Sequence, residues 1–275
     1  MGKSLSMQKK SPIITALLLP ILLISCDNKK APQTSDTDPE KLVWSEEFNY
    51  TGLPDATKWN YDVGGHGWGN NELQFYTEKR QENARVENGN LVIEARKENW
   101  KGKEYTSTRL ISKGKGDWKY GKIEVRARIP AGRGTWPAIW MLASTNPLAW
   151  PDDGEIDIME HVGFDQGKIH GTIHSKKYNH VIGTQKSATI MAPDCSTSFH
   201  VYGLRWTADS IKISIDDNEY FSFANEHDGK AAWPFDQPFH LLLNIAIGGN
   251  WGGQQGVDST IFPARMEIDY IRVYQ

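Results

Sequence analysis

The chain has 275 residues and a formal net charge of −3 at pH 7. A chain of this length can form one large all-β domain or two small ones, with a sizeable core in either case. The scattered basic residues and the weakly negative charge disfavour a nucleic-acid partner. Its 11 tryptophans, 10 tyrosines and 9 phenylalanines are an unusually high aromatic content. Flat indole rings offer apolar platforms with a polar edge, so this composition favours a carbohydrate partner.

The N-terminus has the pattern of an export signal. Two lysines precede an apolar run over residues 13–24, which is too short to span a bilayer as a stable helix. The sequence Leu-Ile-Ser-Cys at 23–26 resembles a bacterial lipobox, with Cys26 as the residue that receives the lipid. An ordinary secretory signal with a chance cysteine is the alternative. We therefore expect residues 1–26 to be a lipoprotein signal peptide. The mature protein would be exported and lipid-anchored in the cell envelope, on its periplasmic or its cell-surface face, with no other membrane contact.

A polar segment follows the signal. Residues 27–41 contain no apolar residue other than one alanine, and such a segment cannot bury enough surface to fold. We predict a flexible tether over 27–41 and one folded domain over 42–275. With Cys26 lipidated, only Cys195 remains, so no intrachain disulfide can form.

Short runs of alternating apolar and polar residues follow one another from residue 42 onward, without a long amphipathic helical pattern. The apolar members of three runs are Leu91, Ile93 and Ala95; Ile123, Val125, Ala127 and Ile129; and Ile211, Ile213 and Ile215. The third run ends at 216–218, a turn signal, and residues 239–247 are almost continuously apolar, as expected of a strand covered on both faces. Residues 266–274 are a further strand candidate. The pattern predicts an all-β fold, a two-sheet antiparallel sandwich.

Three carboxylates lie within six residues of one predicted strand. Glu155, Ile156, Asp157 and Ile158 alternate charged and apolar residues, which is typical of a strand with one face inward. Like charges on one strand face repel, so a functional reason for this arrangement is expected, although a solvated acidic strand is the alternative. On a regular strand Glu160 would point to the opposite face. A single-residue β-bulge would return it to the face of the other two, and bulges are frequent beside active sites.

At this point the chain resembles glycoside hydrolase family 16, and within it the laminarinase-like endo-β-1,3-glucanases. The resemblance covers nearly all of residues 42–275 and rests on six ordered blocks: 44–49 (WSEEFN), 67–76 (GWGNNELQFY), 136–142 (WPAIWML), 155–160 (EIDIME), 248–251 (GGNW) and 269–274 (DYIRVY). It implies a curved β-jelly-roll of the legume-lectin, concanavalin-like kind, with a substrate cleft on its concave face. The spacing Glu-x-Asp-x-x-Glu is similar to that of laminarinases and agarases, whereas lichenases have the shorter Glu-x-Asp-x-Glu.

The resemblance also implies roles for the three carboxylates. Retaining glycoside hydrolysis needs an ionised nucleophile and a protonated acid roughly 5–5.5 Å apart. By analogy Glu155 attacks the anomeric carbon, Glu160 protonates the leaving oxygen, and Asp157 hydrogen-bonds the nucleophile. Because an extended strand rises about 3.3 Å per residue, only a bulge, a curved sheet and converging side chains can bring the two glutamates together. No cofactor is expected for catalysis.

Other residues acquire roles by the same resemblance. The expected substrate-binding residues are Asn70, Glu72, Arg109, Trp136, Trp140, His174 and Trp251. The two tryptophans of block 136–142 would wall the donor subsites, the residues of the Gly-rich loop would form the donor-side rim, and Trp251 would be a further platform. Each has an ordinary alternative as a core, turn or surface residue.

Two groups of residues resemble metal ligands. His170 and His174 could be read as a zinc pair, but the residues between them favour a strand, which would separate them by roughly 13 Å. Family members often carry a structural calcium far from catalysis, and the matching positions are Glu47, the carbonyl of Gly89 and Asp269. Oxygen ligands suit Ca²⁺. A hairpin glycine with unrelated acidic residues is the alternative reading.

Three functions remain open from the sequence. The expected one is a monomeric retaining endo-β-1,3-glucanase acting on laminarin-type β-glucan. A related hydrolase of mixed-linkage glucan or of a galactan such as agar is the second. A non-catalytic sugar-binding lectin is the third, and it predicts the loss of a catalytic carboxylate, whereas all three are present here.

Overall fold

The structure is a computed structural model that describes residues 1–2 and 41–275. The expected signal peptide, the lipidation site Cys26 and the expected tether up to residue 40 lie outside the described residues. Within the described part of the chain, no helix is long and apolar enough to cross a membrane.

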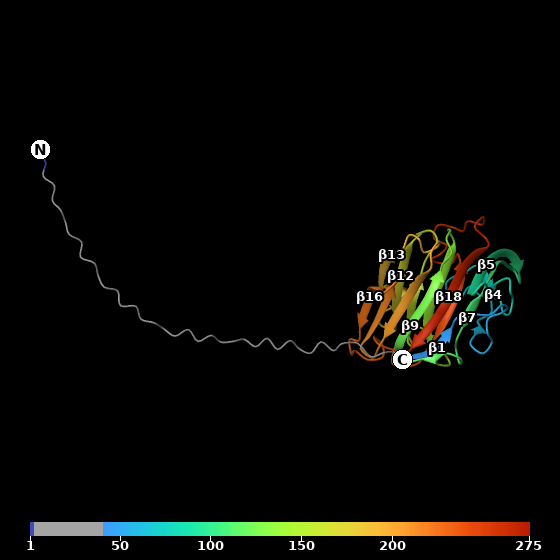
Figure 1. Ribbon diagram of the computed structural model, residues 1–275, viewed down its shortest axis with the longest axis horizontal. Helices are drawn as coiled ribbons and strands as arrows, with labels where there is room; N and C mark the ends of the chain where they lie inside the picture. Colours follow the sequence, from blue (N-terminus) through green and yellow to red (C-terminus); the bar gives the residue numbers. More distant parts are fainter. Residues whose placement is uncertain (3–40) are drawn as a thin grey trace. The chain divides into compact units, whose positions relative to one another are not determined.

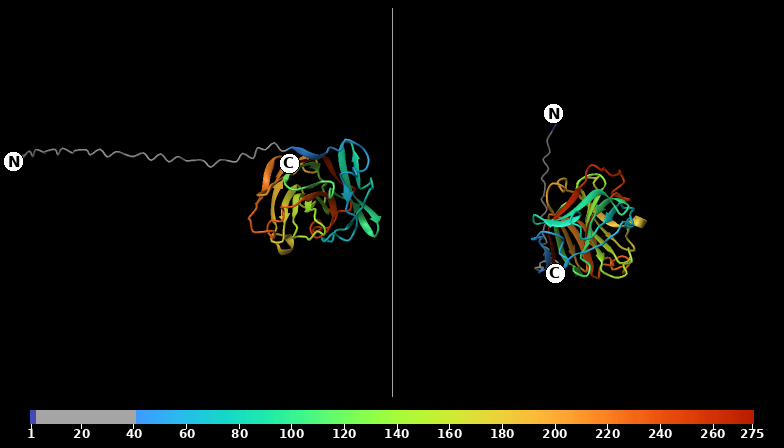
Figure 2. Two further views of the ribbon diagram at one scale, coloured as in Figure 1. Left: turned by 90° about the horizontal axis from the view of Figure 1, so that it is seen from below. Right: turned by 90° about the vertical axis from the view of Figure 1, so that its right-hand side faces the viewer.

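Two sheets form the body, which consists almost entirely of strands and connecting loops (Figures 1 and 2). The ten-stranded sheet has, in spatial order, β16 (Asn218–Ala224), β15 (Ser210–Ile215), β14 (His200–Trp206), β9 (Gly121–Arg128), β18 (Ala264–Tyr274), β5 (Asn90–Trp100), β6 (Lys103–Ser107) and β3 (Gln74–Tyr76), with β1 (Leu42–Glu46) on β18 and β4 (Ala84–Glu87) on β5. The eight-stranded sheet has β13 (Lys186–Met191), β12 (Lys168–His174), β11 (Glu155–Glu160), β10 (Thr135–Ala143), β17 (Phe239–Ile247), β7 (Arg109–Ile111) and β2 (Asn60–Tyr61), with β8 (Asp117–Trp118) on β17. The pairing of β3 with β6 is parallel, and the other pairings of these strands are antiparallel. The predicted two-sheet sandwich is confirmed.

The core lies between the sheets, as the alternating runs predict. In β15 every second residue is buried, and in β9 Ile123, Val125 and Ala127 point inward. All nine residues of β17 are buried, because the core covers one of its faces and the residues that build the cleft cover the other. This strand is therefore the covered strand that its continuous apolar run predicts.

The predicted bulge is present in β11. Asp157 pairs with Thr172 of β12 and Glu160 pairs with His170, so three residues of β11 advance while β12 advances by two. The same irregularity appears against β10. There the consecutive residues Ile139 and Trp140 pair with Met159 and Asp157, so one residue of β11 is left without a partner. Ile158 and Met159 are consecutive and both fully buried in the core. The extra residue reverses the alternation, and it places Glu160 on the same sheet face as Glu155 and Asp157.

Candidate active site

The carboxylates lie at the middle of a cleft on the outer face of the eight-stranded sheet. Two cavities of about 390 and 430 Å³ meet there, and Glu155 and Glu160 line both of them. The first extends over β10, β17 and β7 and is also lined by Trp68, Glu72, Tyr76, Arg109, Trp140 and Asn244. The second extends over β12 and β13 and is also lined by His170, Thr172, His174, Gln185, Ser187 and Trp251. A chain-like substrate can therefore extend in both directions from the carboxylates.

Two indole groups each hold one of the glutamates. Trp136 Nε1 donates a hydrogen bond of 3.0 Å to Glu160 Oε1, and Trp150 Nε1 donates one of 2.8 Å to Glu155 Oε2. His174 Nε2 lies 3.3 Å from Asp157 Oδ2 and 3.9 Å from Glu155 Oε1. These contacts fix the directions in which the carboxyl groups point.

Burial raises the pKa of all three carboxyl groups. For Glu155 the neighbouring charge of Asp157 raises the pKa further, while His174 and the Trp150 N–H lower it. Burial and the charge of Glu155 raise the pKa of Glu160, and burial holds the pKa of Asp157 well above its usual range. Three carboxyl groups in one desolvated cluster cannot all ionise near neutral pH, and the protons leave in steps that belong to the cluster as a whole. The cluster can thus hold an ionised carboxylate and a protonated carboxyl side by side.

A stacked group of aromatic and cationic side chains walls the first cavity. The guanidinium carbon of Arg109 lies 4.8 Å from the ring centre of Trp68 and 4.6 Å from that of Trp140. Arg109 Nε also pairs with Asp62 at 3.0 Å. Cation–π contacts of this kind stabilise the arrangement by about 0.5–2 kcal/mol each. Arg109 therefore holds the two indole rings in place, in addition to any contact with a sugar.

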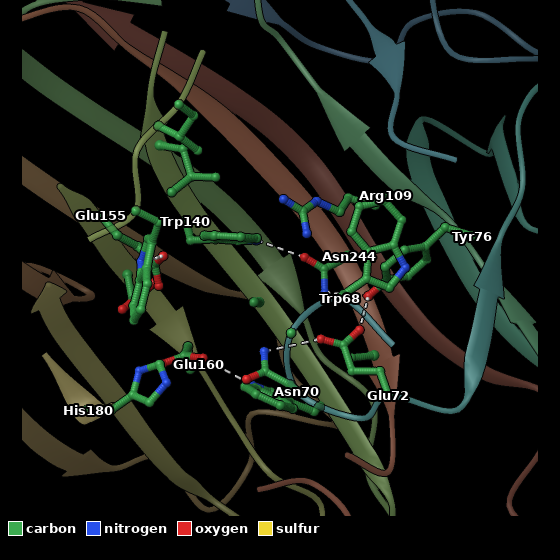
Figure 3. Close-up of a pocket in the computed structure, with 18 of the residues that line it drawn as sticks. Trp68, Asn70, Glu72, Tyr76, Arg109, Trp140, Glu155, Glu160, His180 and Asn244 are labelled. Carbon is green, nitrogen blue, oxygen red and sulfur yellow. Dashed lines mark hydrogen bonds between the residues drawn. The ribbon is translucent and has the colours of Figure 1, made fainter. Parts of the chain in front are cut away.

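A buried hydrogen-bond chain lies behind this wall (Figure 3). Trp140 Nε1 donates to Asn244 Oδ1 at 2.7 Å, and Asn244 Nδ2 donates to the Tyr76 hydroxyl at 3.0 Å. The Tyr76 hydroxyl donates to Glu72 Oε2, which also accepts from Gln74 Nε2 at 2.6 Å. Glu72 is only 7% exposed, and burial raises its pKa. The chain of hydrogen bonds that starts at Trp140 therefore ends at Glu72, whose carboxyl group is its last acceptor.

Two loops that are distant in sequence close over this face together. Asn250 N donates to Asn70 O at 2.7 Å, and Asn71 Nδ2 donates to Asn250 Oδ1 at 2.8 Å. Gly249 has a φ of +75°, and a Cβ there would lie 2.9 Å from Asn70 O. Only glycine fits this close approach at a left-handed backbone position. The pairing explains why the Gly-rich segments 67–76 and 248–251 both contribute to the cleft.

The second cavity has its own aromatic wall. The ring of Trp251 makes edge contacts with Trp136 at 5.4 Å and with His170 at 4.9 Å between ring centres. His170 and His174 lie on strand β12 opposite Glu160 and Glu155 respectively, so the segment between them is the strand that the sequence predicts.

All ten expected catalytic and substrate-binding residues line the cleft. Sequence reasoning missed Trp68, Tyr76, Trp150, His170, His180 and Asn244 as lining residues. Asn244 could have been predicted from the sequence, because it is the only side-chain amide in the apolar run of β17. Trp150 lies on a loop and His180 on a short turn between strands, where the spacing of residues does not predict which way a side chain points.

Donor atoms of Glu155, Asp157 and His174 lie within 4.8 Å of one another, a spacing that could also hold a cation. The expected calcium residues lie elsewhere. Glu47 accepts two hydrogen bonds from Arg272, at 2.9 and 2.8 Å, and Asp269 pairs with Arg126. Both carboxylates are thus already engaged by arginines.

Comparisons with known proteins agree with this geometry. The family model described as glycosyl hydrolases family 16 matches residues 71–272. The chain belongs to this family. It is 55% identical to a β-glucanase of Rhodothermus marinus over 275 residues, covering 97% of this chain and 96% of the relative.

Two solved structures are similar over the folded body. The X-ray structure of the laminarinase from Rhodothermus marinus superposes with a TM-score of 0.84 at 57% identity, covering 86% of this chain and 97% of that one. A mutant of SCLam, a non-specific endo-β-1,3(4)-glucanase of the family co-crystallised with an oligosaccharide, gives a TM-score of 0.84 at 54% identity, with coverages of 87% and 96%. The chain is accordingly a glycoside hydrolase with the family's jelly-roll fold.

Replacing Trp150 with phenylalanine should impair catalysis while preserving most of the cavity wall. The change removes the N–H donor that lowers the pKa of Glu155, so this pKa should rise. A group that must be ionised to react then requires a higher pH, and the acidic limb of kcat/KM should move upward. A hydrogen bond to a charged group contributes about 1.5–3 kcal/mol. At pH values below the shifted acidic limb, kcat/KM should therefore fall roughly 10- to 100-fold.

The matched control is Trp100→Phe, since Trp100 lies at the end of β5 against Arg80 and not in the cleft. Its pH–rate profile should coincide with that of the wild type. An unshifted acidic limb in Trp150→Phe would show that the indole N–H does not act on the group that must ionise.

Proposed function

We propose that the protein is a retaining endo-hydrolase of β-1,3-glucosidic bonds in laminarin-type β-glucan. The observation that carries the proposal is the position of Glu155 and Glu160 where the two cavities meet, each held by an indole N–H. A cleft that extends to both sides of the carboxylates suits cleavage within a chain. Action as a monomer is part of the proposal.

The reaction follows from the protonation of the cluster. Glu155, ionised and held by Trp150, attacks the anomeric carbon, while protonated Glu160 donates its proton to the glycosidic oxygen that leaves. Asp157 interacts with the nucleophile Glu155 and helps to set its charge, because the hydrogen bond and the charge of Asp157 both raise the pKa of Glu155. Glu160, now ionised, takes a proton from water, which attacks the glycosyl-enzyme and releases the product. Two inversions give net retention of configuration.

Hydrolysis of mixed-linkage β-1,3-1,4-glucan is the second candidate. It is favoured by the 54% identity to a glucanase described as non-specific for β-1,3(4) linkages. A galactan substrate has less support, and a lectin has the least, because all three carboxylates are retained. Product analysis on laminarin, mixed-linkage β-glucan and agarose distinguishes these substrates.

Substitutions of the carboxylates test the assigned roles. Glu155→Gln should remove almost all turnover on laminarin and leave oligosaccharide binding largely intact, because the amide preserves shape. Glu160→Ala should be severe on laminarin but milder on an activated aryl glycoside, and added azide should rescue it by attacking the glycosyl-enzyme. Asp157→Asn should cost less than either change. The first-formed product, followed by NMR, should have the β configuration. An α product would mean an inverting reaction and would refute the nucleophilic role of Glu155.

We also propose a structural calcium ion bound by Glu47, Gly89 and Asp269. The strand register supports it, since Glu46 pairs with Ile271 and Leu91 pairs with Ile268 of β18, which brings the three residues to one region of the sheet. A cation would take over the carboxylates that the arginines now hold. Because a ligand bound only to the folded state stabilises it, chelation should lower the melting temperature and leave turnover at low temperature nearly unchanged. Loss of activity without unfolding would contradict a purely structural ion.

We further propose that the mature protein is lipid-anchored in the bacterial cell envelope through Cys26, on the periplasmic or the cell-surface side. The support is the lipobox-like sequence at 23–26 and the polar segment after it. Mass analysis of the protein from membranes should find a diacylglyceryl group on Cys26, and Cys26→Ser should release the protein from the membrane fraction. An unmodified N-terminus at another residue would refute this anchor.

A further inference from the structure

A short turn at the rim of the cleft presents a histidine toward the carboxylates. The turn is η1 (His180–Ile182), and it follows strand β12. Asn179, which is 4% exposed, accepts hydrogen bonds from the backbone N–H groups of Val181 and Ile182 and donates to the carbonyls of Ser175 and Lys176. The turn is therefore held in one conformation before any substrate binds.

The imidazole of His180 is exposed to the cleft, and none of the hydrogen bonds described within residues 41–275 uses its ring nitrogens. Its ring centre lies 5.1 Å from that of Trp150 and 5.2 Å from that of His174. Burial and the nearby His174 lower the pKa of His180, so the ring is neutral at pH 7. A neutral imidazole offers one N–H donor and one nitrogen acceptor, which matches a hydroxyl group, itself both donor and acceptor.

The position of His180 along the cleft relates it to one side of the cleaved bond. It lines both cavities, as do Glu155 and Glu160, so it lies beside the point of cleavage. In Figure 3 it lies beyond the carboxylates on the side away from Arg109 and Trp68. By the family resemblance the Gly-rich loop that carries Trp68 forms the donor-side rim, and Arg109 packs against Trp68. His180 is therefore on the side of the departing sugar.

We propose that His180 binds a hydroxyl group of the sugar unit that leaves, immediately across the cleaved bond from the nucleophile. This inference rests on the proposed function of Glu155 and Glu160. The hydrogen bond would hold the departing sugar with its glycosidic oxygen against Glu160. It also gives the enzyme a contact that is present only when a sugar, and not another leaving group, occupies this position.

Two substrates separate this role from a structural one. Laminaripentaose places sugars on both sides of the cleaved bond, whereas nitrophenyl β-laminaribioside has an aryl leaving group without hydroxyls. For His180→Ala, kcat/KM on the pentasaccharide should fall about five- to tenfold, the effect of one neutral hydrogen bond. On the aryl substrate it should stay within about twofold. His180→Gln should recover part of the loss, since an amide also donates and accepts.

The matched control is Ile182→Ala, which removes an exposed side chain from the same turn, outside the lining of both cavities. It should leave both substrates unaffected. Equal losses of His180→Ala on the two substrates would overturn the proposal, because His180 would then act through Trp150 and Glu155. No loss on the pentasaccharide would overturn it as well. Failure of the wild type on both substrates would instead refute the proposed function.

Discussion

Like carboxyl groups crowded into one poorly solvated cluster are the constraint on which this structure depends. Glu155, Asp157 and Glu160 face the same way only because β11 contains one extra residue. Their burial raises the pKa of each, and such a cluster is tolerable only with hydrogen-bond donors around it. Two indole N–H groups and an imidazole supply the surrounding contacts. Burial and repulsion between the carboxylates destabilise the fully ionised cluster. The same two effects keep one carboxyl group protonated and leave another available as a nucleophile.

Buried strand β17 organises the rest of the cleft. Its Asn244 links Trp140 to Tyr76, and the backbone N–H of its last residue, Ile247, donates to Gln74 Oε1 at 2.7 Å. Buried polar groups need partners, so these contacts tie the Gly-rich loop to the sheet. The loop then carries Trp68 against Arg109. A wall assembled this way is rigid before substrate arrives, which reduces the entropy lost on binding a long, flexible polysaccharide.

The two sides of the cleft are built differently. The wall around Trp140 and Arg109 comes from strands and from a loop bonded to them. By contrast, Trp150, which donates to Glu155, and His180, which lies against Trp150, come from segments between the strands. Strand positions fix the chemistry common to the family. Loop positions can vary without disturbing the sheet, and they are where this chain can adapt its preference among related glycans.

The amino-acid sequence by itself determined the all-β fold, the buried strand 239–247 and the need for a bulge between Asp157 and Glu160. Each follows from short-range periodicity, because side chains on a strand alternate with a period of two and any interruption is visible locally. The same pattern, joined to the family resemblance, located the ten expected cleft residues.

Tertiary structure alone decided which side chains from outside the strands lie beside the carboxylates. Trp150 lies five residues from Glu155 in the chain, and His180 lies beyond the next strand. Neither position follows a periodic rule, since both depend on how loops fold back over the sheet. The stacking of Arg109 between Trp68 and Trp140 joins a loop to two different strands. Such contacts arise from the register of distant strands, which is set by packing of the whole core and not by any local run of residues.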